Sequence, residues 1–188
     1  MPGSVALPSR VISVRNLPKG QPVRPTIRPF EDRDAEEIVG LSLRAWEPAY
    51  ASLERVLGAE IFRRQHPDWW EDQRRAVRSV LAANKGNVWV AEADPVARAG
   101  AVAGFVAVET DHPEEGMGEI SMLGVEPDRQ GVGIGTALTM FALERLKEAG
   151  MGVAMVETGG DPGHAPAWRA YEKAGFTLLP IARYFKNL

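Results

Sequence analysis

The stretch "DRQGVGIGTALTMFALERLKEAG", Asp128 to Gly150, places three glycines at alternate positions and then continues into a helical pattern. Apolar residues recur on one helical face from Ile134 to Ala149, and Gly150 is a typical C-terminal stop. The first amides of such a helix have no partner within it, and the helix dipole favours an anion there. Because glycine lets a ligand approach the backbone without meeting a Cβ, the stretch predicts a phosphate or pyrophosphate site.

Glycines before a helix also occur in P-loops, in dinucleotide-binding folds and in helix starts that bind no ligand. A P-loop requires a lysine directly after its second fixed glycine, and here no lysine appears before Lys147. A dinucleotide fingerprint requires Gly or Ala where Thr136 stands, and "EPDRQ" separates the preceding strand from the first glycine, although Glu157 lies at the distance of a ribose-binding acid. A purely structural role would leave the glycines poorly explained, because each weakens a helix by about 0.5–1 kcal/mol relative to alanine.

Composition limits the kind of protein further. The chain of 188 residues is 45% hydrophobic, enough for one domain with a substantial core. It has no cysteine, which excludes thiolate sites, and three histidines too far apart to predict a metal site. A net charge of −3 offers no basic field for nucleic acid. No apolar run could span a membrane and the start lacks a signal-peptide centre, so we expect a soluble, cytoplasmic protein.

The chain divides into an N-terminal extension and one domain. Residues 1–24 are rich in proline and glycine and predict an irregular segment, and the domain covers residues 25–188. "TIRPF" (26–30) is typical of an edge strand. Asp34, with Glu37 three residues on, has the arrangement of a helix N-cap, and further helical patterns cover 53–62 and 69–83.

The second half alternates strands and helices. "NVWVAEA" and "GAVAGFVAVET" predict a hairpin joined by "DPVARAG", and "GEISMLGVE" (118–126) predicts a third strand. Gly124 in that strand marks a bulge or a close approach by another backbone or a ligand. After the glycine-led helix we expect a buried strand "MGVAMVET", a helix "APAWRAYEKAG", and one or two closing strands in "FTLLPIARYFKNL". The strands flanking the glycine-led helix should be parallel. The fold class is therefore α/β, a mixed sheet of about seven strands with helices on both faces.

Three segments resemble one known family. "RQGVGIGTAL" matches the Q/R-x-x-G-x-G/A signature of the GNAT superfamily of acetyl-CoA-dependent N-acetyltransferases, with Gln130, Gly133 and Gly135 at the defining positions. "EISMLGVEPD" is similar to that family's pantetheine-binding strand, and "HAPAWRAYEKAGF" to its A-x-x-x-Y-x-x-x-G-F helix. The element order from residue 26 to 188 is also the family's. The resemblance implies a GNAT-like fold and acetyl-CoA as cosubstrate, without a metal.

The resemblance also implies a cofactor site. Main-chain groups of Leu123 and Val125 would pair with the pantetheine, amides from Gly131 to Thr136 would hold the pyrophosphate, and a bulge at Gly124 would turn the Leu123 amide toward the thioester carbonyl, a catalytic role. The alternative is a bulge that only adds twist. The complete set of expected cofactor-binding residues is Leu123, Gly124, Val125, Gln130, Gly131, Val132, Gly133, Ile134, Gly135, Thr136, His164, Ala167 and Tyr171.

Two further residues are expected to move protons. Glu119 stands where several family members carry a catalytic glutamate, and strand alternation would place it on the same face as Ser121 and Leu123. A solvated carboxylate, with water relaying the proton, is the alternative. Tyr171 has the motif position of the acid that protonates the leaving thiolate, or it packs in the core. His164 replaces a frequent asparagine and would donate to the cofactor, face the acceptor, or lie on the surface.

The sequence says least about the acceptor, the substrate that would receive the acetyl group. "HPDWWEDQ" combines Asp68, Glu71 and Asp72 with Trp69 and Trp70, which suits a cationic amine, although helix-start acids and a core tryptophan are the stronger explanation. A small amine is therefore weakly favoured over a peptide or protein amine, attacked directly in a ternary complex. A sensor that binds acyl-CoA without turnover is the alternative function. The N-terminal extension and the closing strand are both candidate contacts of a homodimer.

Overall fold

The computed structural model describes residues 25–92 and 101–188, which form one mixed sheet of five strands. The strands lie in chain order: β1 (Thr26–Pro29), β2 (Val88–Glu92), β3 (Val102–Glu109), β4 (Met117–Val125) and β5 (Val153–Met155). The first four are antiparallel to their neighbours, whereas β4 and β5 are parallel. The predicted edge strand, hairpin and parallel pair are confirmed. The predicted N-terminal extension and the "DPVARAG" connection lie outside the described residues.

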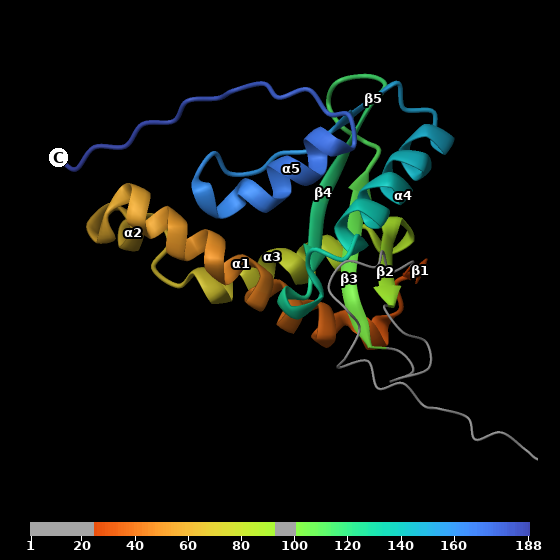
Figure 1. Ribbon diagram of the computed structural model, residues 1–188, viewed down its shortest axis with the longest axis horizontal. Coiled ribbons are helices and arrows are strands. Elements are labelled where there is room, and N and C mark those ends of the chain that lie inside the picture. Colours follow the sequence, from red (N-terminus) through yellow and green to blue (C-terminus); the bar gives the residue numbers. More distant parts are fainter. Residues whose placement is uncertain (1–24, 93–100) are drawn as a thin grey trace, which may run out of the picture.

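Helices cover both faces of this sheet, as expected (Figure 1). On one face α1 (Ala35–Leu57) and α3 (Trp69–Ala83) bury apolar side chains against β2 and β3, with Phe105 at the centre of that cluster. On the other face α4 (Ile134–Glu148) packs Leu138 and Ala142 against Val106 and Ile120. The remaining helices are α2 (Ala59–Gln65) and α5 (Ala165–Lys173), with short turns η2 (Asp32–Asp34), η3 (Lys85–Asn87), η4 (Pro127–Arg129) and η5 (Pro162–His164).

The start of α1 differs from its sequence prediction. Asp34 stands at the N-cap position of α1 but makes no side-chain cap bond to that helix. Its carboxylate instead accepts two 2.8 Å hydrogen bonds from Arg28 of β1 and one, also 2.8 Å, from the Glu31 amide in the capping box of η2. Glu37 accepts a 3.0 Å hydrogen bond from the Val102 amide of β3. The helix then continues through Pro48 to Leu57, where the left-handed φ of +78° at Gly58 separates it from α2. The patterns at 35–45 and 53–57 therefore belong to one helix.

The predicted closing strands are not formed in the structure. Residues 176–188 form no strand; they run away from the sheet in Figure 1 with most of their apolar side chains exposed. Pro180 interrupts the run and has no amide to donate to a ladder. The described sheet consequently has five strands rather than about seven. "MGVAMVET" is also not a buried strand: β5 has three residues, and Val153, at the edge of the sheet that the described residues form, is 56% exposed.

Candidate functional site

The parallel strands β4 and β5 pair over only part of their length. The pairs join Met117 to Val153, Gly118 to Ala154 and Glu119 to Met155, and in the described ranges the two strands pair no further. β4 continues to Val125, paired with β3. Along the rest of β4, the edge that would face β5 therefore has no strand partner among the described residues. In α/β sheets, ligands bind where the carboxyl ends of the strands diverge in this way.

The glycine loop leads from the end of β4 into α4. Gly131 and Gly133 have φ values of +77° and +99°, a left-handed conformation that other residues adopt at a cost. Gly133 is the N-cap of α4 and no side chain caps this end. The first intrahelical bond joins the Ala137 amide to the Gly133 carbonyl, at 2.9 Å. The amides before Ala137 point out of the helix end and can hold an anion.

The three glycines of this loop are therefore present for different structural reasons. Backbone conformation explains Gly131 and Gly133, which corrects the expectation that structure alone explains none of them. Gly135 has no positive φ, and a Cβ there would make only one ordinary contact, 3.6 Å from a Val125 methyl. Gln130 donates a 3.1 Å hydrogen bond from Nε2 to the Val125 carbonyl, tying the loop to β4. The side chain of Ile134 is buried, so only its amide can face a ligand.

The bulge in β4 lies at Ser121 and not at Gly124. Met122 opposes Ala107, and Ile120 opposes the next residue of β3, so Ser121 is the extra residue of β4. Gly124 pairs regularly within the ladder. The predicted bulge position is therefore wrong, because register depends on the partner strand and one strand's sequence does not contain it.

Gly124 is instead required by packing against α1. A Cβ at Gly124 would lie 2.8 Å from Cε1 of Phe105, 2.9 Å from Cζ3 of Trp46 and 3.2 Å from Cδ2 of Leu41. Two of these distances are shorter than real Cβ contacts. The glycine thus lets α1 approach the sheet closely beside the open edge of β4.

The bulge also changes the face on which Glu119 lies. Glu119 is directly opposite Glu109 of β3, and directly opposite residues share a face. Asn84, at the end of α3, donates a 3.3 Å hydrogen bond to Glu109, which identifies this face as the α1 and α3 side. Leu123 packs with the cluster on the α4 side. The predicted common face of Glu119 and Leu123 is wrong, because the extra Ser121 inverts the alternation.

The surroundings of Glu119 favour its protonated form. Burial, followed by the nearby charges of Glu109 and Glu157, raises the pKa of this carboxyl above its usual range, and His112 acts in the opposite direction. A carboxylate with a raised pKa is a better proton acceptor than an exposed glutamate. The geometry therefore permits the expected role of Glu119 as a base.

Helix α5 carries the other expected residues. Tyr171 is half-buried with its ring edge-on to Phe176, the two centroids 5.8 Å apart. Burial raises the pKa of its phenol above 10, so the hydroxyl keeps its proton at neutral pH and can donate it. Ala167, four residues earlier, lies on the same side of the helix. His164 ends η5 directly before α5, and its Nδ1 lies 2.5 Å from Oδ2 of Asp161.

Sequence reasoning missed the residues around His164. Asp161 is buried and is also bonded to Ser52, a buried residue of α1 that is 109 positions away along the chain. Asp161 stands three residues before His164 in the Gly- and Pro-containing turn "GGDPGH", which is a local signal that could have identified it. Nothing in the sequence around Ser52 indicates this contact.

The acidic and aromatic start of α3 is not a free anionic surface. Glu71 pairs with Arg74 at 3.5 Å, and Asp72 pairs with Arg75, both within the same helix. Trp69 stacks on Tyr50 of α1 with centroids 4.4 Å apart. Packing and helix-start charge therefore account for much of this segment.

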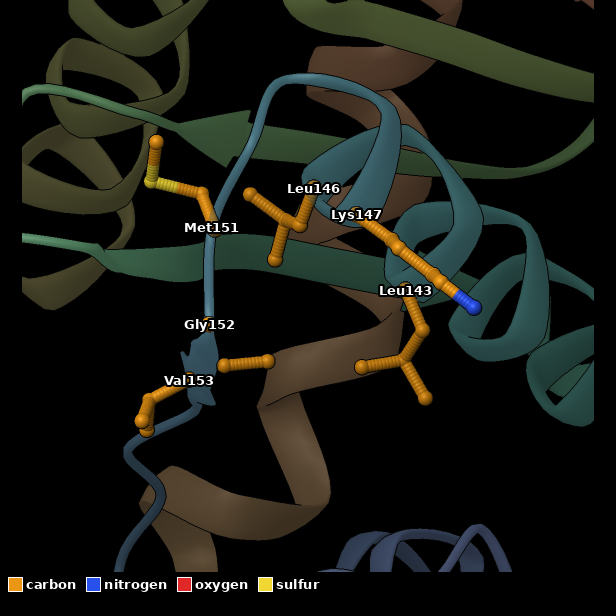
Figure 2. Close-up of a pocket in the computed structure, with 7 residues that line it drawn as sticks. Leu143, Leu146, Lys147, Met151, Gly152 and Val153 are labelled. Atoms are coloured by element: carbon orange, nitrogen blue, oxygen red, sulfur yellow. The ribbon is translucent and has the colours of Figure 1, made fainter.

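A shallow groove lies at the other end of α4, where α4 meets β5 (Figure 2). It is lined by Leu143, Leu146, Lys147, Met151, Gly152, Val153 and Ala154. Because α4 has 15 residues, about 20 Å of helix separates this groove from the glycine loop. The groove is therefore not part of the site at the start of α4.

Metal ligands and membrane spans are both absent from the described ranges. Residues 25–92 and 101–188 contain no cluster of three or more His, Asp or Glu side chains placed to hold a metal ion. In the same ranges no helix is long and apolar enough to cross a membrane.

The open edge of β4 and the uncapped start of α4 define a class of protein, in which an α/β sheet holds a phosphorylated ligand between diverging parallel strands. Comparison with known proteins identifies the family within that class. Residues 55–176 match the model of the acetyltransferase (GNAT) family. The chain belongs to this family, and its membership argues against the dinucleotide-binding interpretation of the glycines.

Individual relatives agree with this assignment. A mycothiol acetyltransferase of Sanguibacter keddieii is 37% identical over 154 residues, 76% of this chain and 45% of the relative. A GNAT acetyltransferase of Brucella melitensis, solved with acetyl-CoA, has a TM-score of 0.51 at 24% identity and covers 83% of this chain and 84% of its own. An aminoglycoside N-acetyltransferase solved with CoA has a TM-score of 0.55 at 16% identity, covering 92% and 99%. The chain spans about half the length of the mycothiol acetyltransferases that it matches.

Proposed function

We propose that the chain transfers an acetyl group from acetyl-CoA to an amine. The observation that carries this proposal is the end of β4–β5 pairing at Glu119, while β4 continues to Val125 and into the glycine loop. An open strand edge can pair with the amide groups of a pantetheine arm, and the amides before Ala137 can hold a pyrophosphate. Family membership and the solved acetyl-CoA complex of a relative support the same cosubstrate.

The cofactor site of this proposal uses main chain more than side chain. Leu123 and Val125 contribute backbone groups from the open edge of β4, and residues 131–136 contribute amides. The bulge has a chemical role in this proposal, because Ser121 has no partner in β3 and the local ladder is disrupted there, which can free a main-chain donor. One such donor would hold the thioester oxygen as negative charge develops there.

The reaction is a direct attack within a ternary complex. The amine nitrogen forms a bond to the acetyl carbon, the carbon–sulfur bond breaks, and the thiolate of CoA leaves. Glu119 takes the proton that the amine loses, and its raised pKa suits this role. Tyr171 donates the proton that the thiolate gains, and solvent then restores both groups.

We propose a small cationic amine as the acceptor. Glu109 and Glu119 lie opposite each other on the α1 and α3 side of the sheet, and the charge of Glu157 reaches Glu119. Glu71 and Asp72 of α3 are paired with arginines, so we do not assign the binding of a positive acceptor to them. In this proposal the carboxylates near Glu119 attract it instead. The name of one structural relative, an aminoglycoside N-acetyltransferase, is consistent with a small amine.

The test is release of free CoA thiol from acetyl-CoA over an amine panel. The panel contains an aminoglycoside (kanamycin), a polyamine (spermidine), an aromatic monoamine (tyramine) and a peptide with an N-terminal alanine. We expect thiol release that depends on one of the small amines, with mass spectrometry showing the acetylated product. Binding of acetyl-CoA without thiol release for any amine would indicate the acyl-CoA sensor instead, and acetylation of the peptide alone would overturn the small-amine proposal.

A further inference from the structure

A buried carboxylate fixes the orientation of His164. Asp161 is only 7% exposed, and its Oδ2 lies 2.5 Å from Nδ1 of His164. Its Oδ1 accepts the Gly163 amide at 2.9 Å, and the Ser52 hydroxyl of α1 is a further hydrogen-bond partner. The same amide lies 2.9 Å from Ser52 Oγ. These bonds prevent Asp161 from turning away from the histidine.

One edge of the imidazole ring is also closed by packing. A Cβ at Gly159 would lie 2.4 Å from Cε1 and 2.5 Å from Nδ1 of His164, so the ring rests directly on that glycine. Trp168 of α5 donates a 2.9 Å hydrogen bond to the Gly159 carbonyl and holds this support in place. Nε2 is the ring atom on the other side of Cε1, and a Cβ at Gly159 would not contact it as closely as Cε1 and Nδ1.

His164 Nε2 is open to a ligand. In the described part of the chain the hydrogen bond of this ring is at Nδ1, to Asp161, and Nε2 makes none. The His164 side chain is 22% exposed. A neutral imidazole that donates from Nδ1 carries its lone pair on Nε2. Asp161 therefore presents Nε2 to the surroundings as a hydrogen-bond acceptor.

The position of η5 brings His164 to the region where β4 and β5 diverge. η5 follows the carboxyl end of β5, where β4 and β5 diverge, and packs on α1 at Ala49 and Ser52. Tyr50, between them, belongs to the aromatic stack with Trp69. Tyr171 is seven residues after His164, on the same face of α5 and about 10 Å along its axis. His164 thus lies on a turn that contacts α1, the helix on the same side of the sheet as Glu119.

We infer that Asp161 is a positioning residue that fixes His164 as the Nδ1–H tautomer, and that His164 Nε2 accepts a hydrogen bond from the amine acceptor. The inference rests on the proposed acetyl transfer. A hydrogen bond at this point orients the attacking nitrogen and selects acceptors that carry an N–H or O–H donor there.

The tautomer is tested by nitrogen NMR on protein labelled with ¹⁵N-histidine. The chain has three histidines, so the loss of one ring in His164→Gln assigns the signal. At a pH high enough for the imidazole to be neutral, we expect a protonated Nδ1 and a bare Nε2. Asp161→Asn should invert this, because the asparagine amide can donate to Nδ1, whereas Ser52→Ala should leave it unchanged. An unchanged His164 spectrum in Asp161→Asn overturns the positioning role, and this readout requires no turnover.

The contact with the acceptor is tested by kinetics with the best amine of the panel. Glutamine can present its carbonyl near the position of Nε2, whereas asparagine reaches only that of Nδ1. We expect His164→Asn and Asp161→Asn to raise KM for the amine about ten-fold with kcat and the acetyl-CoA Kd retained, and His164→Gln to stay close to the native protein. Ser52→Ala is the graded comparison: it removes one bond to Asp161 and leaves the Gly163 amide in place, so KM should rise less than in Asp161→Asn.

Each other outcome counts against the inference. A higher acetyl-CoA Kd in His164→Asn would place Nε2 against the cofactor, and equal KM values in His164→Gln and His164→Asn would remove Nε2 from the acceptor site. Equal effects of Ser52→Ala and Asp161→Asn on KM would reduce Asp161 to a structural role. If no amine is acetylated, the proposed function fails, and the NMR experiment still decides the role of Asp161.

Discussion

At the scale of single residues, Glu119 connects structure to a pH dependence. Its carboxyl must be ionised to accept a proton, so kcat/KM falls as the pH drops through its pKa, which burial and Glu109 raise. We predict that Glu119→Gln lowers kcat/KM about 10²–10⁴-fold. Glu109→Gln, which removes a repelling charge, should move the acid limb of the pH–rate profile to lower pH.

His112 provides the control for that experiment. Its charge lowers the pKa of Glu119, so His112→Gln should move the same limb to higher pH, opposite to Glu109→Gln. If the acid limb moves in the same direction in both variants, or moves in neither, then it reports the ionisation of a group other than Glu119. Retention of full activity in Glu119→Gln would favour a proton relay through water.

Tyr171 is tested by removing one oxygen atom. Because the phenol keeps its proton at neutral pH, Tyr171→Phe should lower turnover about 10²–10⁴-fold while the Kd of acetyl-CoA changes little. The ring contact with Phe176 is retained in this variant, so the melting temperature serves as the check on packing. Unchanged turnover would reassign Tyr171 to the core.

At the scale of elements, the start of α4 distinguishes ligand binding from backbone geometry. Gly135 has room for a Cβ within the protein and no left-handed φ, so Gly135→Ala should keep or slightly raise stability. It should nevertheless weaken acetyl-CoA binding, since the methyl would occupy the approach of the pyrophosphate. Calorimetric titration and a thermal melt measure the two effects separately.

Gly133→Ala is the matched comparison within the same loop. Its φ of +99° makes any side chain costly, so this variant should lose about 1–2 kcal/mol of stability, before any effect on binding. If acetyl-CoA binds Gly135→Ala as tightly as the native chain, the pyrophosphate does not lie at this helix end.

The sequence predicts elements better than it predicts contacts between them. The helix α4, its glycine stop and the parallel pair follow from local pattern, because periodicity and turn residues act over a few positions. The bulge at Ser121 depends on the register against β3, and the Asp161–Ser52 contact joins segments 109 positions apart, so neither appears in local pattern. The prediction of closing strands failed for a related reason. A segment of high β-propensity forms a strand only where it pairs with the edge of another strand.

At the scale of the whole molecule, two exposed surfaces lie without a described partner. Val153 on the free edge of β5 is 56% exposed beside the groove of Figure 2, and Leu178, Leu179 and Ile181 of the closing segment are more than 70% exposed. Exposed apolar surface of this kind marks an interaction site. We predict that residues 176–188 cover the β5 edge in solution, from the same chain or from a second copy.

Hydrogen exchange and solution mass test this prediction together. The Val153 amide already bonds to the Gly116 carbonyl, so the amide of the next residue, Ala154, faces the free edge. That amide should be protected in the native chain and should exchange faster in a Leu179→Ser, Ile181→Ser variant, because that variant weakens the apolar contact of the segment with the groove. A mass of one chain by light scattering assigns the segment to its own chain, and a mass of two chains that falls to one in the variant assigns it to a dimer. Val56→Ser, which changes an exposed residue of α1, is the control and should alter neither measurement. Equal exchange at β5 in all three proteins would show that the edge of the sheet is open in solution.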